Sequence, residues 1–387
     1  MSFRPLERIA FVIPNLSGGG AARVATILTR EWVELGHEVH LLTFEDPGMV
    51  SVYGVDERVR RRQIGLVRSP RNLAGMVLTN FLRVRRLRKE LHAIRPSVII
   101  SFLLDANAVT ILAASPFSAP VVISERNHPS REKVGALKAR IRATVYPLAD
   151  RLCVQTRDIG KWYADNLTLE STVIPNPAPT ALSFPIPPTV EPKNGHRYLA
   201  VGLGRLEPQK GYDRLIEAFA LVKDQLANWD LVIFGEGRER SRLEAQIVNC
   251  GLQERVRLPG TTSDPKAELE KADAFIHPSR YEGYPNAVIE ALAAGLCVIA
   301  TDCPGACGEL LGGGQYGVLA PDAGANELAN AILPVLLDHK MRCAFAMQAT
   351  NAVSSLAPKS IAQRWLDVAR LSGKTTRTMH DPNLLNN

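Results

Sequence analysis

Two cations in one loop, Arg205 and Lys210, have the spacing of a site for a phosphorylated ligand. They lie in the segment 202–211, which follows a short apolar run and is interrupted by glycine and proline. Because these residues keep the segment from being helical, both cations can converge on one anion, and a diphosphate carries enough charge to require two. The alternative is a solvated loop that merely contains two basic residues.

Two carboxylates, Glu282 and Glu290, lie on either side of a predicted helix start. Pro285 suits the first helical position, and the amides of Asn286 and Ala287 would be exposed at the N-terminus of this helix, where anions bind. Glu282 could accept hydrogen bonds from sugar hydroxyls. Glu290, on an otherwise apolar helix, needs a partner such as a ribose diol, unless it is a buried structural glutamate capped by backbone.

A glycine run containing Gly18 and Gly19 separates an apolar strand pattern from a helix that begins near Ala21. Glycines allow a ligand to approach the backbone N–H groups, and the helix start favours a phosphate. A tight turn without a ligand is one alternative. Dinucleotide binding is another, with Glu45 as the ribose-binding acid, but the third glycine of that motif is replaced by Arg23.

The elements that must position these residues alternate between β-branched runs and longer helical patterns, which predicts parallel sheets built from βαβ units. The predicted strands are 8–13, 38–44, 97–102, 121–124 and 151–155 in the first half, and 197–202, 230–234, 255–258, 274–276, 297–300 and 317–319 in the second. Seven prolines between Pro175 and Pro192 exclude a helix or central strand there and predict a linker. A chain of 387 residues is long enough for two cores. We therefore predict an α/β protein with two Rossmann-like domains facing each other across a cleft, where such folds bind ligands.

Positive charge is concentrated in the first half of the chain. The net charge is +7, and residues 1–180 hold 25 Lys and Arg against 16 Asp and Glu. Twelve of these cations lie between Arg58 and Arg95, where Glu90 is the only acid. This imbalance favours an anionic partner, although a helix over 73–91 that packs one face and solvates the other explains most of the pattern. The membrane-facing candidates are Arg83, Arg85, Arg86, Arg88 and Lys89.

Composition and cysteine usage exclude several classes of protein. A hydrophobic fraction of 46% and a charged fraction of 22% are typical of a globular chain and not of a disordered one. The six cysteines are too few and too scattered for a disulfide framework, and Cys303 and Cys307 lack the further ligands of a zinc site. The apolar run Ile9–Ile13 is too short for a signal peptide, and no stretch predicts a membrane-spanning helix. These features predict a cytoplasmic protein.

Together these motifs resemble family 4 (GT4, group 1) of the retaining glycosyltransferases, which have the GT-B fold. The resemblance covers residues from about 8 to 370. Within the family, the chain is similar to bacterial members that act on lipid-linked or exopolysaccharide saccharides. Its motifs are Gly18-Gly19-Gly20-Ala21, Val173-Ile174-Pro175-Asn176, Gly204-Arg205-x4-Lys210-Gly211 and Glu282-x7-Glu290.

The resemblance implies a role for each matched residue. Arg205 and Lys210 hold the diphosphate of a nucleotide-sugar, Glu282 contacts the donor sugar, and these three are the expected catalytic residues. The expected donor-binding residues are Gly18, Gly19, Thr261, Gly283, Tyr284, Asn286, Ala287 and Glu290. The donor is expected to be a UDP-sugar bound as a substrate, so no cofactor is expected. The chain has no aspartate pair spaced D-x-D, in agreement with a metal-independent reaction.

The resemblance also implies how the chain is divided into domains. The expected parts are an acceptor-binding domain at 1–178, a proline-rich linker at 179–195, a nucleotide-sugar-binding domain at 196–358, a helix at 359–372 that could pack back on the N-terminal domain, and a flexible tail at 373–387.

One segment departs from the family pattern. Many members carry a histidine directly after the fourth N-terminal strand, whereas here Ser124 is followed by Glu125, and the acceptor-side candidates are Arg126, Asn127 and His128. The expected acceptor is a saccharide or a polyprenyl-diphosphate-linked saccharide, used at the inner face of the cytoplasmic membrane in cell-surface polysaccharide or glycolipid assembly. His277, which precedes a proline, is predicted to be a packed residue at a strand end and not a site residue.

Two other functions remain as alternatives. A GT-B nucleotide-sugar epimerase would use the same cleft, but it needs acid and base carboxylates that the sequence does not place. A nucleic-acid-binding protein would explain the basic run 58–95. It would leave the pairs Arg205/Lys210 and Glu282/Glu290 without a purpose, and no aromatic residue is interleaved between Arg83 and Arg95, so we expect no nucleic-acid partner.

Overall fold

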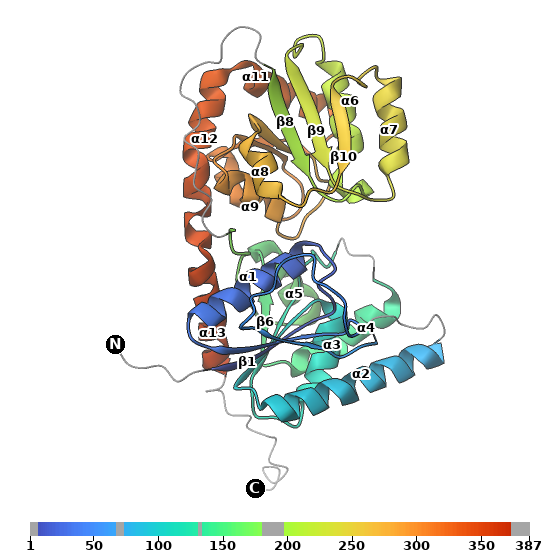
Figure 1. Ribbon diagram of the computed structural model, residues 1–387, viewed down its shortest axis with the longest axis vertical. Coiled ribbons are helices and arrows are strands. Elements are labelled where there is room, and N and C mark those ends of the chain that lie inside the picture. Colours follow the sequence, from blue (N-terminus) through green and yellow to red (C-terminus); the bar gives the residue numbers. More distant parts are fainter. Residues whose placement is uncertain (1–6, 67–72, 131–133, 180–196, 373–387) are drawn as a thin grey trace. The chain divides into compact units, whose positions relative to one another are not determined.

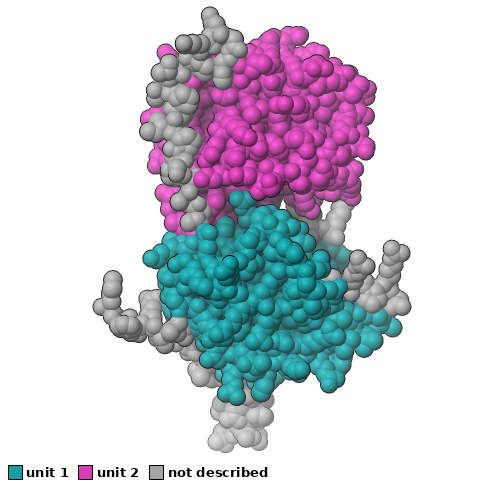
Figure 2. Space-filling view, viewed as in Figure 1, with its two compact units in different colours: residues 1–126, 133–174, 359–387 teal, residues 127–132, 175–358 magenta. Residues whose placement is uncertain are grey.

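The chain folds into two compact units. A computed structural model describes residues 7–66, 73–130, 134–179 and 197–372 (Figure 1). Unit 1 comprises residues 1–126, 133–174 and 359–387, and unit 2 comprises residues 127–132 and 175–358 (Figure 2). The predicted tail 373–387 and the predicted linker, apart from residue 179, lie outside the described residues.

Unit 1 contains a seven-stranded parallel sheet in the order β3-β2-β1-β4-β5-β6-β7. Its strands are β1 (Arg8–Ile13), β2 (Glu38–Thr43), β3 (Arg60–Gln63), β4 (Val98–Phe102), β5 (Val121–Ser124), β6 (Arg151–Val154) and β7 (Ser171–Val173). The strand order changes direction between β1 and β4, as in Rossmann folds. Every residue of β4 is buried, and all but Ser101 are apolar, because helices cover both faces of the sheet.

Six α-helices accompany this sheet in the part of the chain that the structure describes. They are α1 (Gly20–Glu34), α2 (Leu73–Ile94), α3 (Leu104–Ala114), α4 (Ala136–Val145), α5 (Arg157–Leu167) and α13 (Pro358–Ser372). The last of these lies far along the chain from the others, yet its residues Ile361, Trp365 and Leu366 are buried in the same cluster as β1 and α1. The indole of Trp32 donates to the carbonyl oxygen of Ala362 at 3.0 Å. The helix α13 thereby packs as part of unit 1.

Unit 2 repeats the same architecture with a six-stranded parallel sheet in the order β10-β9-β8-β11-β12-β13. Its strands are β8 (Tyr198–Leu203), β9 (Trp229–Phe234), β10 (Val256–Gly260), β11 (Ala274–His277), β12 (Val298–Thr301) and β13 (Val318–Ala320). Its helices are α6 (Tyr212–Leu221), α7 (Arg240–Asn249), α8 (Pro265–Glu270), α9 (Asn286–Ala293), α10 (Cys307–Leu310), α11 (Ala325–Leu337) and α12 (His339–Val353). The order changes direction between β8 and β11.

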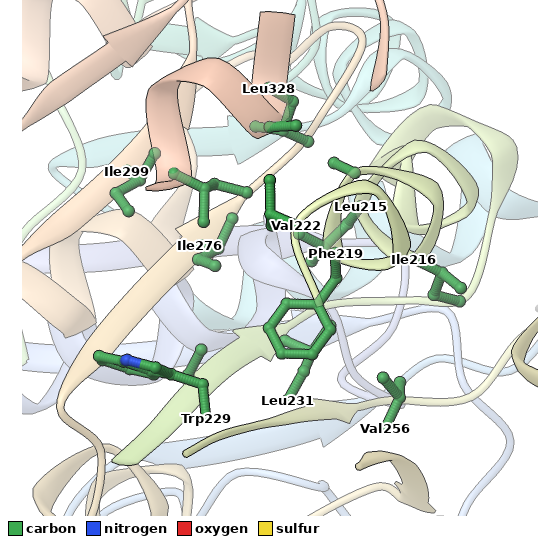
Figure 3. Packing of buried hydrophobic residues seen from close by; sticks show 14 of the residues in the cluster. Leu215, Ile216, Phe219, Val222, Trp229, Leu231, Val256, Ile276, Ile299 and Leu328 are labelled. Atoms are coloured by element: carbon green, nitrogen blue, oxygen red, sulfur yellow. The ribbon is translucent and has the colours of Figure 1, made fainter. Parts of the chain in front are cut away.

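Apolar clusters fill both faces of the second sheet. Figure 3 shows one of them, in which Phe219 of α6 lies next to Leu231 of β9. The regular recurrence of apolar residues along α6 is the pattern expected for a helix lying on a sheet. These packed faces hold the strand ends, and therefore the loops that follow them, in fixed places.

Two strands were not predicted, and both are at edges of the first sheet. The strand β3 consists of three arginines and a glutamine, and β7 has three residues that are all half-buried. Edge strands need no apolar face and tolerate charge, so they lack the signal by which the central strands were found. Among the described helices, none is long and apolar enough to cross a bilayer.

Candidate active site

The motif loops of unit 2 follow two adjacent strands. β8 and β11 pair in parallel, with Ala200 opposite Ala274 and Val201 opposite Phe275. The loop containing Arg205 and Lys210 follows β8, and the loop containing Glu282 follows β11. These are the strands between which the sheet order reverses, and ligands of such sheets bind beyond the carboxyl ends of the strands at this point.

Backbone and side-chain contacts tie the two loops together. The backbone N–H of Arg280 donates to the carbonyl of Gln209 at 2.8 Å, and the amide of Gln209 donates to the carbonyl of Tyr281 at 2.9 Å. Gly211 has φ +68°, and a Cβ there would lie 2.0 Å from the carbonyl oxygen of Pro278. This contact leaves room only for glycine.

The arrangement places three hydrogen-bond donors on one oxygen of Glu282. Lys210 Nζ lies 2.6 Å from Oε1, Ser279 Oγ donates to the same oxygen at 2.6 Å, and His277 Nε2 lies 3.0 Å from it. The carboxylate is buried, at 5% exposure. Oε2 accepts no hydrogen bond from any residue that the structure describes, so one oxygen is saturated and the other remains available.

Opposing effects set the charge of Glu282. Burial alone raises the pKa of this carboxyl, but the positive charge of Lys210 and the hydrogen bond from His277 outweigh it and lower the pKa below its ordinary value of 4.5. Burial lowers the pKa of His277, against the opposing effect of Glu282. At neutral pH Glu282 is therefore a carboxylate, and His277 is a neutral imidazole that donates to it from Nε2.

His277 is the functional candidate that the sequence analysis missed. It is packed at the end of β11 and buried, as predicted, but its ring also holds Glu282. Its Nδ1 is buried and has no hydrogen-bond partner among the described residues. The available signal was its place at the end of a buried strand, five residues before Glu282.

The helix after Glu282 begins as predicted, with one shift. Pro285 caps α9 and does not occupy its first helical position, which is Asn286. Asn176, from the Val-Ile-Pro-Asn motif, donates to the side-chain oxygen of Asn286 at 2.5 Å and to the carbonyl of Tyr284 at 3.3 Å. Glu290 is buried on α9, as are Gly283 and Tyr284 in the preceding loop, while Ala287 is half-buried in the first turn.

The remaining donor-side residues of unit 2 lie on the surface. Arg205 is exposed, and its guanidinium makes no ion pair or hydrogen bond with any described residue. Thr261 is exposed directly after β10. The structure thus brings Lys210 and Glu282 into contact, and it leaves Arg205 open to an external anion.

In unit 1 the glycine loop precedes α1. Gly18 and Gly19 have φ +132° and +86°, and no atom lies within 4 Å of a Cβ added at either position. The backbone N–H of Leu16 donates to Glu45 Oε1 at 2.8 Å, and Arg61 holds the other oxygen of Glu45 at 2.8 Å. Because Glu45 is fully buried and engaged in this way, it does not provide the ribose-binding acid of a dinucleotide site.

The acceptor-side candidates fall into different units. Arg126 groups with unit 1, and Asn127 and His128 group with unit 2. The Arg126 guanidinium lies over the ring of Phe102 at 4.4 Å, and burial lowers its pKa to about 9. His128 is buried, with Nδ1 2.7 Å from the hydroxyl of Ser130.

The predicted basic surface needs one correction. Arg83 is buried, donates to the carbonyl of Leu66 and lies over the ring of Phe44, so it does not face a membrane. Its side chain lies on the inward face of α2, because Leu87 and Leu91, four and eight residues later, form the packed face of this helix. The candidates Arg85, Arg86, Arg88 and Lys89 are exposed.

The cysteines do not form a metal site in the part of the chain that the structure describes. Cys303 and Cys307 are buried with their sulfurs 4.0 Å apart, and no group of three or more potential metal ligands occurs among the described residues. Burial raises the pKa of Cys297 to about 12, which is typical of an unreactive thiol.

Comparison with known proteins identifies the family. Residues 18–182 match the family model described as "Glycosyltransferase Family 4", and residues 187–352 match "Glycosyl transferases group 1". A Campylobacter jejuni relative is 26% identical over 93% of this chain and 98% of its own length. That protein is described as "GalNAc-alpha-(1->4)-GalNAc-alpha-(1->3)-diNAcBac-PP-undecaprenol alpha-1,4-N-acetyl-D-galactosaminyltransferase".

Solved structures share the fold. Sucrose-phosphate synthase from Thermosynechococcus elongatus superposes with a TM-score of 0.80 at 18% identity, covering 94% of this chain and 98% of that one. Anabaena HepE in complex with UDP superposes with a TM-score of 0.74 at 20% identity, covering 94% of this chain and 99% of that one. These comparisons confirm the predicted family and the GT-B fold with its two Rossmann-like domains. The chain belongs to the group 1, family 4 glycosyltransferases.

Proposed function

We propose that this glycosyltransferase moves a sugar from a UDP-sugar, with retention of configuration, to a polyprenyl-diphosphate-linked saccharide or growing polysaccharide. The observation that carries the proposal is the contact of Lys210 with Glu282, together with the exposed Arg205 in the same loop as Lys210; the side chain of Arg205 has no partner among the described residues. One cation already held by a carboxylate and a second cation open to solvent suit a ligand that joins a diphosphate to a sugar.

In this proposal Lys210 binds both Glu282 and the diphosphate of the donor. Its ammonium has three protons and uses one on Glu282, so the other protons can be donated to a diphosphate oxygen. Arg205 adds a second charge, and the backbone N–H groups in the first turn of α9 add donors that bear partial positive charge. As the bond between sugar and phosphate breaks, negative charge develops on UDP, and these groups stabilise it.

Glu282 orients the donor sugar. Three donors fix Oε1, so Oε2 is held rigidly and can accept a hydrogen bond from a sugar hydroxyl. Its lowered pKa makes Glu282 a weak base at neutral pH, which favours an orienting and electrostatic role. In the retaining route that we propose, a donor phosphate oxygen takes the acceptor proton on the face that the leaving group vacates, so no protein base is required.

The acceptor and the location rest on different support. The name of the Campylobacter relative describes an undecaprenol-diphosphate-linked acceptor, and unit 1 exposes Arg85, Arg86, Arg88 and Lys89 along α2. We extend both observations to a site of action at the inner face of the cytoplasmic membrane. The comparisons do not favour an epimerase or a nucleic-acid-binding protein.

The experiment is an incubation of the protein with a panel of nucleotide-sugars, with and without a polyprenyl-diphosphate-linked saccharide. We expect slow UDP release from one UDP-sugar alone, faster release with acceptor, and an α-linked product by NMR from an α-linked donor. A β-linked product would overturn retention, and a new UDP-sugar formed without acceptor would show an epimerase. Release from GDP-sugars only would overturn the donor nucleotide.

A further inference from the structure

The two halves of α2 expose opposite kinds of side chain. In the first half the exposed side chains include Val77, Leu78 and Phe81, at 64%, 58% and 61%, and residues 73–82 contain no charge. The second half exposes Arg85, Arg86, Arg88 and Lys89. A rise of 1.5 Å per residue separates Phe81 from Lys89 by about 12 Å along the helix. Apolar and cationic surfaces therefore follow one another along the axis of α2, whose first turns project past α3 and α4 in Figure 1.

An apolar cavity of about 490 Å³ lies beside this helix, within unit 1. Phe81 and Val84 of α2, Leu104 and Leu112 of α3, and Ile141 of α4 line it. Eight of its thirteen lining residues are apolar, and the volume is within the usual range of about 300–1,000 Å³ for a small-molecule site. None of the residues assigned above to donor binding lines this cavity.

Two of the five polar residues that line the cavity, Arg88 and Lys138, are cations. Arg88 donates to the carbonyls of Leu112 and Ala113 at 2.7 and 3.2 Å, so its guanidinium is held at the end of α3. Lys138 pairs with Asp105 at 2.9 Å, which is the only acid among the lining residues. Arg85 and Lys89, which are close to Arg88 on the helix, make no ion pair with any described residue. The cavity thus has apolar walls and an excess of positive charge.

We infer that this cavity binds the first isoprene units of a polyprenyl diphosphate, with its phosphates at Arg88 and the neighbouring cations of α2. A polar saccharide or a nucleic acid would leave the apolar walls unfilled, whereas a chain with an anionic head group matches both parts. The inference rests on the proposed function, since it assigns a place to the lipid part of the acceptor.

Titration of the full-length protein with farnesyl diphosphate tests the inference. We expect saturable binding, at least tenfold weaker for inorganic diphosphate and for farnesol. Leu112→Glu places a carboxylate at the cavity on a residue that is 43% exposed, so the unit should still fold. This variant should bind farnesyl diphosphate at least tenfold more weakly than the wild type. Leu148→Glu makes the same change at a residue 61% exposed that does not line the cavity, and it should leave binding unchanged.

Titration with UDP distinguishes failure of the inference from failure of the proposed function. UDP binding by all three proteins, with farnesyl diphosphate binding absent or unaffected by Leu112→Glu, would overturn the cavity and leave the transferase intact. Farnesyl diphosphate binding without any UDP binding would overturn the proposed function. A third titration uses phosphatidylcholine vesicles that contain no polyprenol. If the protein binds these vesicles as tightly as farnesyl diphosphate, and Leu112→Glu weakens both to the same extent, the cavity binds an acyl chain and the inference is overturned.

Discussion

One oxygen of Glu282 accepts from Lys210, Ser279 and His277, and this unequal use of a carboxylate is the basis of the proposed donor site. A buried carboxylate with a single cation would retain rotational freedom. Three donors from three directions remove that freedom and direct the second oxygen. Two of these donors, Lys210 and His277, also keep the group ionised, so the orientation and the charge of Glu282 depend in part on the same contacts.

Glu282→Gln and Lys210→Ala are each expected to reduce turnover by at least about a hundredfold. The glutamine keeps the shape of the side chain but loses the charge, and the alanine removes the cation from the leaving group. Initial rates of UDP release, with circular dichroism as the control for folding, measure the effect. Full activity in either variant would remove the assigned roles.

His277 is expected to act as a positioning residue. His277→Phe keeps a planar ring but removes the donor to Glu282, so kcat should fall about tenfold or more with a smaller change in KM for the donor. A role confined to packing would leave kcat unchanged as long as the variant folds.

The lowered pKa of His277 also predicts a pH dependence of stability. Below pH 6.5, the ordinary pKa of histidine, His277 takes up a proton in the unfolded chain but not in the folded protein, where its ring is buried. The free energy of unfolding therefore falls as the pH is lowered through this range. Relative to His277→Phe, the wild type should lose up to about 1.4 kcal/mol per pH unit on acidification below 6.5. Urea denaturation at pH 7.5, 6.5 and 5.5 measures the difference, and parallel curves would contradict it.

At the scale of elements, two loops after neighbouring strands are held by a glycine. Gly211→Ala forces a Cβ to within 2.0 Å of the Pro278 carbonyl and is expected to displace the Lys210 loop from Glu282. Gly36→Ala is the matched control, because its φ of +86° causes similar strain of about 1–2 kcal/mol but no atom lies within 4 Å. UDP affinity should fall at least tenfold in the first variant only. Equal affinities would contradict the role of Gly211.

The sequence predicted the central strands and the two motif loops because apolar runs, glycines and prolines mark them directly. It missed β3, whose three arginines carry no apolar signal, and it misjudged Arg83, whose inward direction depends on the packed face of α2. It predicted the burial of His277 but not its contact with Glu282. That contact depends on the conformation of the loop after β11, which no local pattern encodes.

At the scale of the whole molecule, much of the positive charge of the first half is balanced within unit 1. Arg58 pairs with Glu34 and Asp56, and Arg60 pairs with Glu38. Two of these acids lie more than twenty residues away in sequence, so the window 58–95 alone overstated the excess. The unbalanced charge on α2 is concentrated in its second half.

This distribution predicts which basic residues matter for membrane binding. Arg85→Ala with Lys89→Ala should weaken binding to vesicles rich in anionic lipid by about tenfold or more, at roughly 1 kcal/mol per cation, and the effect should shrink in high salt. Arg58→Ala with Arg60→Ala removes two exposed but paired cations and should change binding less. Sedimentation with vesicles measures both, and equal binding to neutral vesicles would contradict the membrane role.

The central claim is that Lys210 and Glu282 form the donor site, and calorimetric titration with UDP tests it most directly. The wild type should bind UDP saturably, Lys210→Ala should lose at least about tenfold in affinity, and Lys266→Ala, which removes an exposed lysine paired with Glu270 on α8, should bind as the wild type does. Equal UDP affinity in the wild type and Lys210→Ala, or no UDP binding by the wild type, would contradict the account.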